Sequence, residues 1–202
     1  GEHEKIIKAF KDKKADIFQC GKELFSSQGF KDTTISDIAK KAGIGVGTFY
    51  NYYTSKEDLF IEIYAKENEQ LKKEIFQSLD LNQDPVSIVK ELVKRNIKAI
   101  NGNPILKQWY NPSFYRKLEK MYHEVDIKRN HCVTNMYQDL FKEWKKDGLI
   151  REDIEDDMMM AFLDALISID THKEEIGIHH FPQIILYLAE FIMQGLTRPQ
   201  NN

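Results

Sequence analysis

Apolar side chains recur every three to four residues along most of the chain, and this spacing predicts an all-α fold. One such face carries Ile17, Gly21, Leu24 and Phe25, and its helix is expected to end at Gly29. The sequence lacks the alternation of apolar and polar residues that is typical of strands. Glycine, asparagine and proline positions divide the chain into about nine predicted helices.

The segment 34–53 predicts two short helices joined by a glycine. Thr34 and Asp37 have the spacing of a capping box at the start of the first helix, which is expected to stop at Gly43. In the next helix the apolar spacing predicts a buried face made of Val46, Phe49, Tyr50 and Tyr53. Two short helices connected in this way are typical of a helix-turn-helix.

The opposite face of the second short helix consists of small and polar residues, which are Gly45, Gly47, Thr48, Asn51 and Tyr52. Two glycines in an exposed helix cost about 1 kcal/mol each relative to alanine, so stability alone does not favour them. Small residues allow a close approach to DNA, and the side chains of threonine and asparagine suit base edges. The alternative interpretation is a loosely packed surface helix with a frayed end.

Phosphate contacts are predicted beside this face. Tyr50 and Tyr52 offer hydroxyl groups, as does Thr34 at the start of the first short helix. Lys56 lies in the first turn of the following helix, where its charge opposes the helix dipole. A phosphate bound at that helix end would account for the lysine.

The segment 34–59 reads TISDIAKKAGIGVGTFYNYYTSKEDL and strongly resembles the TetR family of bacterial transcriptional regulators. The resemblance extends over about residues 12–64. Gly45 stands where many members carry a capping serine, and Tyr53 stands where phenylalanine is commoner. Val46 replaces a frequent lysine or arginine, so the resemblance adds Val46 to the base-facing positions and implies few charged contacts there.

The resemblance implies two parts, a DNA-binding domain over residues 1–60 and a helical ligand-binding and dimerisation domain over residues 61–202. Within the second part, the apolar spacing predicts helices over 56–79, 84–100 and 114–146, with a short segment at 105–110. Two further helices are predicted near 153–173 and 182–196.

The last two predicted helices are apolar on nearly all sides, which indicates burial on two sides. The resemblance implies that they pair with their copies in a homodimer. The predicted interface residues are Met159, Phe162, Leu166, Ile185, Leu188 and Ile192. A core within one chain is the alternative.

Aromatic residues are frequent in the middle of the second part. The resemblance implies a pocket there for a small, apolar or aromatic effector, and the candidate lining residues are Trp109, Phe114, Tyr122, Tyr137, Phe141 and Phe162. Aromatic residues at helical spacing equally fit a plain hydrophobic core.

The distribution of charged residues is informative mainly within residues 1–65. The chain has a formal net charge of −3, and residues 1–65 contain ten lysines and ten acidic residues, so the predicted DNA-binding part is neutral. Five of these lysines lie in the helical segment 4–14, which is either a solvated face or an arm that meets a phosphate backbone.

The sequence shows no pattern typical of a membrane span, a metal site or a catalytic site. The longest nearly apolar run, 158–169, is too short for a membrane span, which needs about 20 residues. The two cysteines and six histidines, including His123 and His131, show no metal-site spacing, and no catalytic motif is present. We therefore expect a cytoplasmic protein that needs neither cofactor nor metal and is not an enzyme.

The combined prediction is a ligand-responsive repressor that binds a palindromic double-stranded DNA operator as a homodimer and is released by a small molecule. The neutral charge of residues 1–65 keeps an alternative open, a helical ligand-binding or protein-interaction module without sequence-specific DNA binding. A metal-responsive variant is a third possibility.

Overall fold

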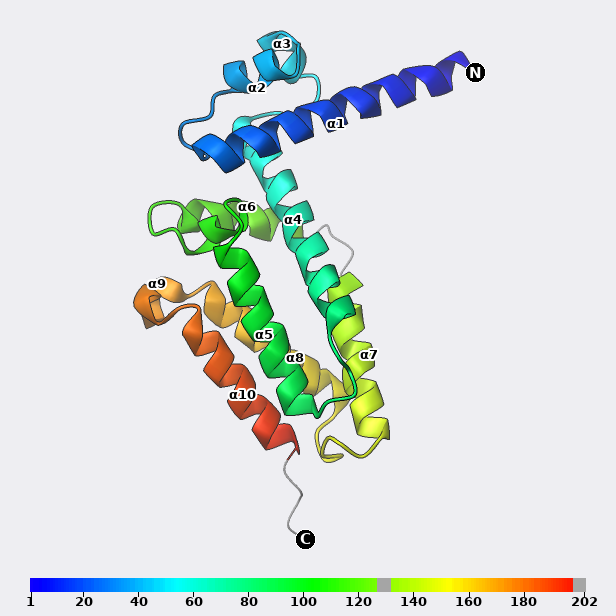
Figure 1. The fold of residues 1–202 in the computed structure, drawn as a ribbon, viewed down its shortest axis with the longest axis vertical. Coiled ribbons are helices and arrows are strands. Elements are labelled where there is room, and N and C mark those ends of the chain that lie inside the picture. Colours follow the sequence, from blue (N-terminus) through cyan, green and yellow to red (C-terminus); the bar gives the residue numbers. More distant parts are fainter. Residues whose placement is uncertain (127–131, 198–202) are drawn as a thin grey trace.

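The computed structural model describes residues 1–126 and 132–197, and within these residues it contains ten α-helices, two short 3-10 helices and no strand. The predicted all-α fold is confirmed. A small head, formed by the first three helices and the start of the fourth, lies at one end of a longer helical body (Figure 1). None of the described helices is long and apolar enough to cross a membrane.

The head begins with a long helix, α1 (Glu2–Gln28), which ends at Gly29 with a positive φ of 84° as the sequence predicts. The short helix α2 (Ile35–Lys41) has the predicted capping box. The backbone N–H of Asp37 donates to Thr34 Oγ1 at 3.0 Å, and the backbone N–H of Thr34 donates to Asp37 Oδ2 at 3.1 Å. A turn at Gly43, with φ of 70°, leads into the single-turn helix α3 (Val46–Phe49).

Helix α4 (Lys56–Ser78) connects the head to the body without a break. Its N-cap is Ser55, whose hydroxyl accepts the backbone N–H of Asp58 at 3.0 Å. One hydrophobic core, which we call core 1, includes Ile17, Phe49 and Leu59 in the head and also Leu106 and Leu118 in the body. The predicted domain boundary at residue 60 therefore lies inside a continuous helix and a continuous core.

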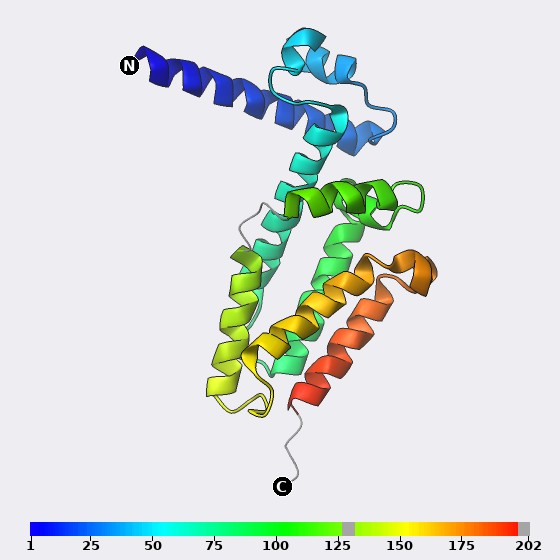
Figure 2. The ribbon, with the colours of Figure 1, turned by 180° about the vertical axis from the view of Figure 1, so that it is seen from behind.

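The body contains α5 (Pro85–Asn101), the 3-10 segment η1 (Leu106–Tyr110), α6 (Tyr115–Asp126), α7 (Cys132–Lys146) and α8 (Asp156–Asp170). It ends with α9 (Lys173–Ile176), η2 (Ile178–His180) and α10 (Gln183–Thr197). Helix α10 packs along α5 and α8, and α7 lies beside α8 and the lower half of α4 (Figure 2). A second hydrophobic core, core 2, lies between these helices and includes Leu92, Trp144, Met159 and Met193.

The prediction of one long helix over 114–146 is wrong. Helices α6 and α7 run in different directions, and their apolar faces serve different cores (Figure 1). Leu118 of α6 belongs to core 1, whereas Trp144 of α7 belongs to core 2. Neither glycine nor proline occurs between Tyr115 and Lys146, so the sequence carries no local signal for this change of direction.

Candidate functional site

The surface of α3 is exposed almost throughout. Phe49 is fully buried in core 1 and fixes the helix to the head. Around it, the described surface exposes the residues of the predicted base-facing set, which are Gly45, Val46, Gly47, Thr48 and Asn51. Asn51 lies just beyond the end of α3, in a turn where its backbone N–H donates to the carbonyl of Thr48 at 3.0 Å.

The two glycines of this surface are not required by the fold. A Cβ atom added at Gly45 or at Gly47 would meet no atom within 4 Å, and neither residue has a positive φ. Gly21 in α1 is a contrast, because a Cβ there would lie 2.7 Å from Leu59 Cδ2 of α4. Gly21 is thus explained by helix packing, whereas Gly45 and Gly47 leave space for something outside the chain.

The predicted burial of Val46 and Tyr50 is wrong. Val46 is 43% exposed and Tyr50 is 52% exposed, because α3 is a single turn that is held to the head through Phe49 and the following Tyr53. Their exposure leaves both side chains available at the surface, in keeping with the predicted contacts of Val46 with bases and of Tyr50 with phosphate.

Two other predicted phosphate contacts have partners within the chain. The ring of Tyr52 stacks on Phe10 of α1, with the ring centroids 4.6 Å apart. Lys56 Nζ donates to the backbone carbonyl of Phe30 at 2.8 Å and lies 4.1 Å from the centroid of the Phe30 ring. These contacts give Lys56 a structural role that the sequence does not reveal. Thr34, the remaining member of the set, is exposed.

The predicted pocket residues do not form one group. Trp109 and Tyr122 pack together with their ring centroids 5.7 Å apart, and Tyr64 of α4 joins them. Phe114 instead contacts Phe30 and Phe60 at the junction of head and body. The other three predicted residues pack against core 2, and they are Tyr137, Phe141 and Phe162.

A group of charged and aromatic residues that includes Trp109 surrounds one buried lysine side chain. Lys173 is fully buried, and its Nζ donates to Glu119 Oε1 at 2.5 Å and to the carbonyl of Asp170 at 2.6 Å. The carboxylate of Asp170 accepts hydrogen bonds from Trp109 Nε1 and, at 3.1 Å, from Tyr110 Oη. Burial raises the pKa of Asp170, although Lys173 and the two hydrogen bonds oppose this shift. We call these five residues the Lys173 cluster.

The Lys173 cluster joins η1, α6, the end of α8 and α9, and the sequence analysis missed it. Lys173 Nζ also lies 4.7 Å from the ring centroid of Trp109 and 5.0 Å from that of Tyr115. The one sequence signal is the pair Trp109–Tyr110, since buried indole and phenol groups need hydrogen-bond partners. Their partners lie about 60 residues away in sequence, at the end of a helix where polar residues are ordinarily solvated.

Of the predicted interface residues, the structure buries Met159 in core 2, at 1% exposure. Phe162 and Ile192 also pack against this core. The other three are partly buried, and they are Leu166, Ile185 and Leu188. Among the described side chains of α8 and α10, the most exposed large apolar ones are Met158, Tyr187 and Phe191, which were not predicted.

The histidines of the predicted metal-responsive alternative do not converge in the described part of the chain. His123 is exposed, and His131 lies outside the described residues. Among the described residues, no group of three or more histidine, cysteine, aspartate or glutamate side chains is placed to hold a metal ion.

The three-helix head and the exposed α3 define a helix-turn-helix protein, and comparison with known proteins specifies it further. Residues 17–63 match the family described as bacterial regulatory proteins, tetR family. The HTH-type transcriptional repressor KstR2 of Mycolicibacterium smegmatis is 26% identical over 196 residues, covering 93% of this chain and 92% of that protein. The family match is thus confined to the head and the start of α4, whereas the similarity to the repressor KstR2 extends over nearly the whole chain.

Solved structures agree with this fold over nearly the whole chain. RolR in complex with resorcinol has a TM-score of 0.64 at 15% identity, and the match covers 97% of this chain and 98% of RolR. FadR from Thermus thermophilus in complex with lauroyl-CoA has a TM-score of 0.57 at 20% identity, covering 94% and 97% of the two chains. At these identities the likeness concerns the fold, and the two different ligands belong to those proteins.

Proposed function

We propose that this protein is a ligand-responsive transcriptional repressor that binds a palindromic operator as a homodimer. The observation that carries the proposal is the exposed surface around α3, where Gly45 and Gly47 leave open space beside Thr48 and Asn51. Glycine permits a close approach of the backbone to a ligand, and asparagine pairs with adenine through two hydrogen bonds. The similarity to the repressor KstR2 supports repression.

The proposed dimer uses the outer faces of α8 and α10. Met158, Tyr187 and Phe191 are more than half exposed, and the rings of Tyr187 and Phe191 stack on each other along α10. The stacked pair Tyr187–Phe191 forms an exposed apolar patch on α10, and such patches are typical of protein interaction sites. A two-fold axis through this face would present two heads to half-sites about 34–36 Å apart, one helical turn of DNA.

The proposed effector acts on the half of the body next to the head, where Tyr64 and Tyr122 pack on Trp109 of the Lys173 cluster. The complexes of RolR with resorcinol and of FadR with lauroyl-CoA support a small-molecule effector in general. Release of DNA requires that the effector bind the released conformation more tightly than the bound one. We accordingly propose residues 1–60 as the DNA-binding part and residues 61–202 as the effector-binding and dimerisation part.

Selection of bound duplexes from a random DNA library, at a low and a high salt concentration, tests the proposal. We expect enrichment of one palindrome, with binding that weakens as salt rises because phosphate contacts release counterions. Salt-sensitive binding without an enriched sequence would contradict a specific repressor. Sedimentation of the protein alone tests the dimer, with Tyr187→Glu as the variant that should yield monomers.

A helical interaction module without sequence-specific DNA binding is the second candidate, and the neutral charge of residues 1–65 favours it. It predicts no enrichment of any sequence at either salt concentration. Addition of a chelator to the binding reaction separates the metal-responsive variant, since only that variant would change its DNA affinity.

A further inference from the structure

The first half of α1 extends beyond the rest of the head. It projects away from the body on the side of α3, and every residue from 1 to 12 is exposed (Figures 1 and 2). Ile6 is 67% exposed, although it continues the apolar face that buries Ile17 further along the same helix. We call residues 1–14 the arm.

The arm is joined to the head next to α3. Phe10 stacks on Tyr52, three residues after the end of α3, and Lys14 Nζ lies 5.0 Å from the ring centroid of Tyr53. The helix from Glu2 to Phe10 extends about 12 Å outward from this contact at 1.5 Å per residue. That length matches three to four base pairs, since DNA rises about 3.4 Å per base pair.

The positive charge of the head is concentrated in the arm. Residues 1–14 contain five lysines and three acidic residues, whereas residues 15–65 contain five lysines and seven acidic residues. Lys13 pairs with Asp16 at 3.8 Å. Lys5, Lys8 and Lys11 are exposed and form no ion pair with any of the described residues.

We propose that the arm is a second DNA-binding element, in which Lys5, Lys8 and Lys11 bind phosphates that flank the half-site read by α3. This proposal rests on the proposed function and adds a phosphate-binding site to it. The ligand is the DNA backbone, because the unpaired charge is positive and the Phe10–Tyr52 contact holds the arm beside α3. The arm thereby supplies the counterion release that residues 15–65, with their excess of acidic residues, do not.

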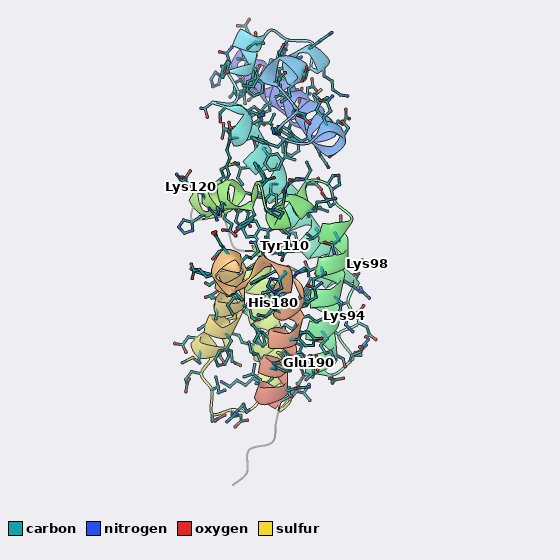
Figure 3. All side chains as sticks on the ribbon, turned by 90° about the vertical axis from the view of Figure 1, so that its left-hand side faces the viewer. Lys94, Lys98, Tyr110, Lys120, His180 and Glu190 are labelled. Carbon is teal, nitrogen blue, oxygen red and sulfur yellow. The ribbon has the colours of Figure 1, made fainter. Side chains whose placement is uncertain are left out.

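The test compares two triple variants of the full chain on the selected palindrome. The arm variant is Lys5→Gln/Lys8→Gln/Lys11→Gln. The control variant removes the same charge from exposed body positions, through Lys94→Gln/Lys98→Gln/Lys120→Gln (Figure 3). All six lysines are exposed, so thermal unfolding should be unchanged in both variants.

Binding constants measured over a range of salt concentrations give the result. Each lost phosphate contact reduces the slope of log K against log salt by about 0.9, so we expect a reduction of about 2.7 for each bound head in the arm variant. The control variant should keep the slope of the unmodified protein. The selected sequence should be the same for all three proteins, because phosphate contacts carry no direct sequence information.

An unchanged slope in the arm variant, with a palindrome still selected, overturns the arm proposal and leaves the proposed function intact. A change of oligomeric state in place of a change of slope also overturns it, because the arm would then bind protein. If the unmodified protein selects no palindrome, the proposed function itself fails.

Discussion

Replacing Gly47 with alanine separates what α3 needs for stability from what it needs for function. Gly47 lies inside α3 with an ordinary negative φ, and an added Cβ would meet no atom of the chain within 4 Å. Alanine restricts the unfolded chain more than glycine does and has the higher helix propensity. Gly47→Ala should therefore raise the free energy of unfolding by about 0.4–1 kcal/mol.

The same methyl group should weaken DNA binding. Nothing in the chain fills the space beside Gly47, so the methyl would occupy the side of α3 that is proposed to face the groove. We expect at least a tenfold loss of affinity for the operator, which corresponds to about 1.4 kcal/mol. A variant that is more stable and yet binds DNA less well cannot be explained by partial unfolding.

Thermal unfolding and fluorescence anisotropy on the selected palindrome measure the two effects. The melting temperature should rise by about 1–4 °C, given about 2–4 °C per kcal/mol for a chain of this size. Gly102→Ala at the end of α5 is the control, because Gly102 also has a negative φ and an added Cβ would meet its nearest atom at an ordinary 3.6 Å, and it should leave DNA affinity unchanged. Gly21→Ala should lower stability, because its Cβ would lie 2.7 Å from Leu59 Cδ2. Unchanged operator affinity in Gly47→Ala would refute the proposed close approach of α3 to DNA.

Three further predictions concern base recognition, the Lys173 cluster and the tyrosines. Asn51→Ala should relax the preference at one base-pair position in a repeated selection, and an unchanged motif would contradict a base contact. Lys173→Met leaves Glu119 without its partner and should cost about 3 kcal/mol in chemical denaturation, whereas Lys94→Met at an exposed site should cost nothing measurable. Burial raises the pKa of Tyr137 to about 12, so stability should be fully present below pH 10 and fall between pH 10 and 12, as the unfolded chain ionises first. Urea unfolding at several alkaline pH values measures this effect, and Tyr137→Phe should reduce it.

The helices of the head could be predicted from the sequence because the residues that define their ends lie close together in the chain. The Thr34 capping box, the stop at Gly43 and the Ser55 cap each depend on residues within four positions, and the structure contains all three. Val46 and Tyr50 were misplaced for a physical reason, since a single-turn helix has no second turn to define which face is inward. Helical periodicity is informative only over several turns.

The body could not be derived in the same way, because its decisive contacts join distant segments. Tyr110 meets Asp170 and Lys173 meets Glu119 across more than 50 residues, and no spacing rule connects such positions. The division of 114–146 into α6 and α7 also depends on which core each half contacts. The aromatic content left an effector pocket and a plain core as open interpretations, and tertiary packing placed Phe114 at the junction with the head and Phe141 against core 2.

The contacts between head and body offer a route by which a ligand bound near Trp109 changes the position of the head, and with it that of α3. Phe30, in the loop before α2, contacts Phe114 with ring centroids 4.9 Å apart, and Lys117 of α6 donates to Glu57 at 2.9 Å. Lys117 holds the pKa of Glu57 below its ordinary value, so this ion pair is charged in the folded protein near neutral pH.

The start of α6 is therefore fixed to the head at two points, while Tyr122 further along α6 contacts Trp109. Where a ligand separates Trp109 from Tyr122 by shifting α6, close packing in core 1 passes that shift to Phe30 and the loop that leads into α2. The proposed effector thus needs to move one helix, α6, to change how the head lies on the body.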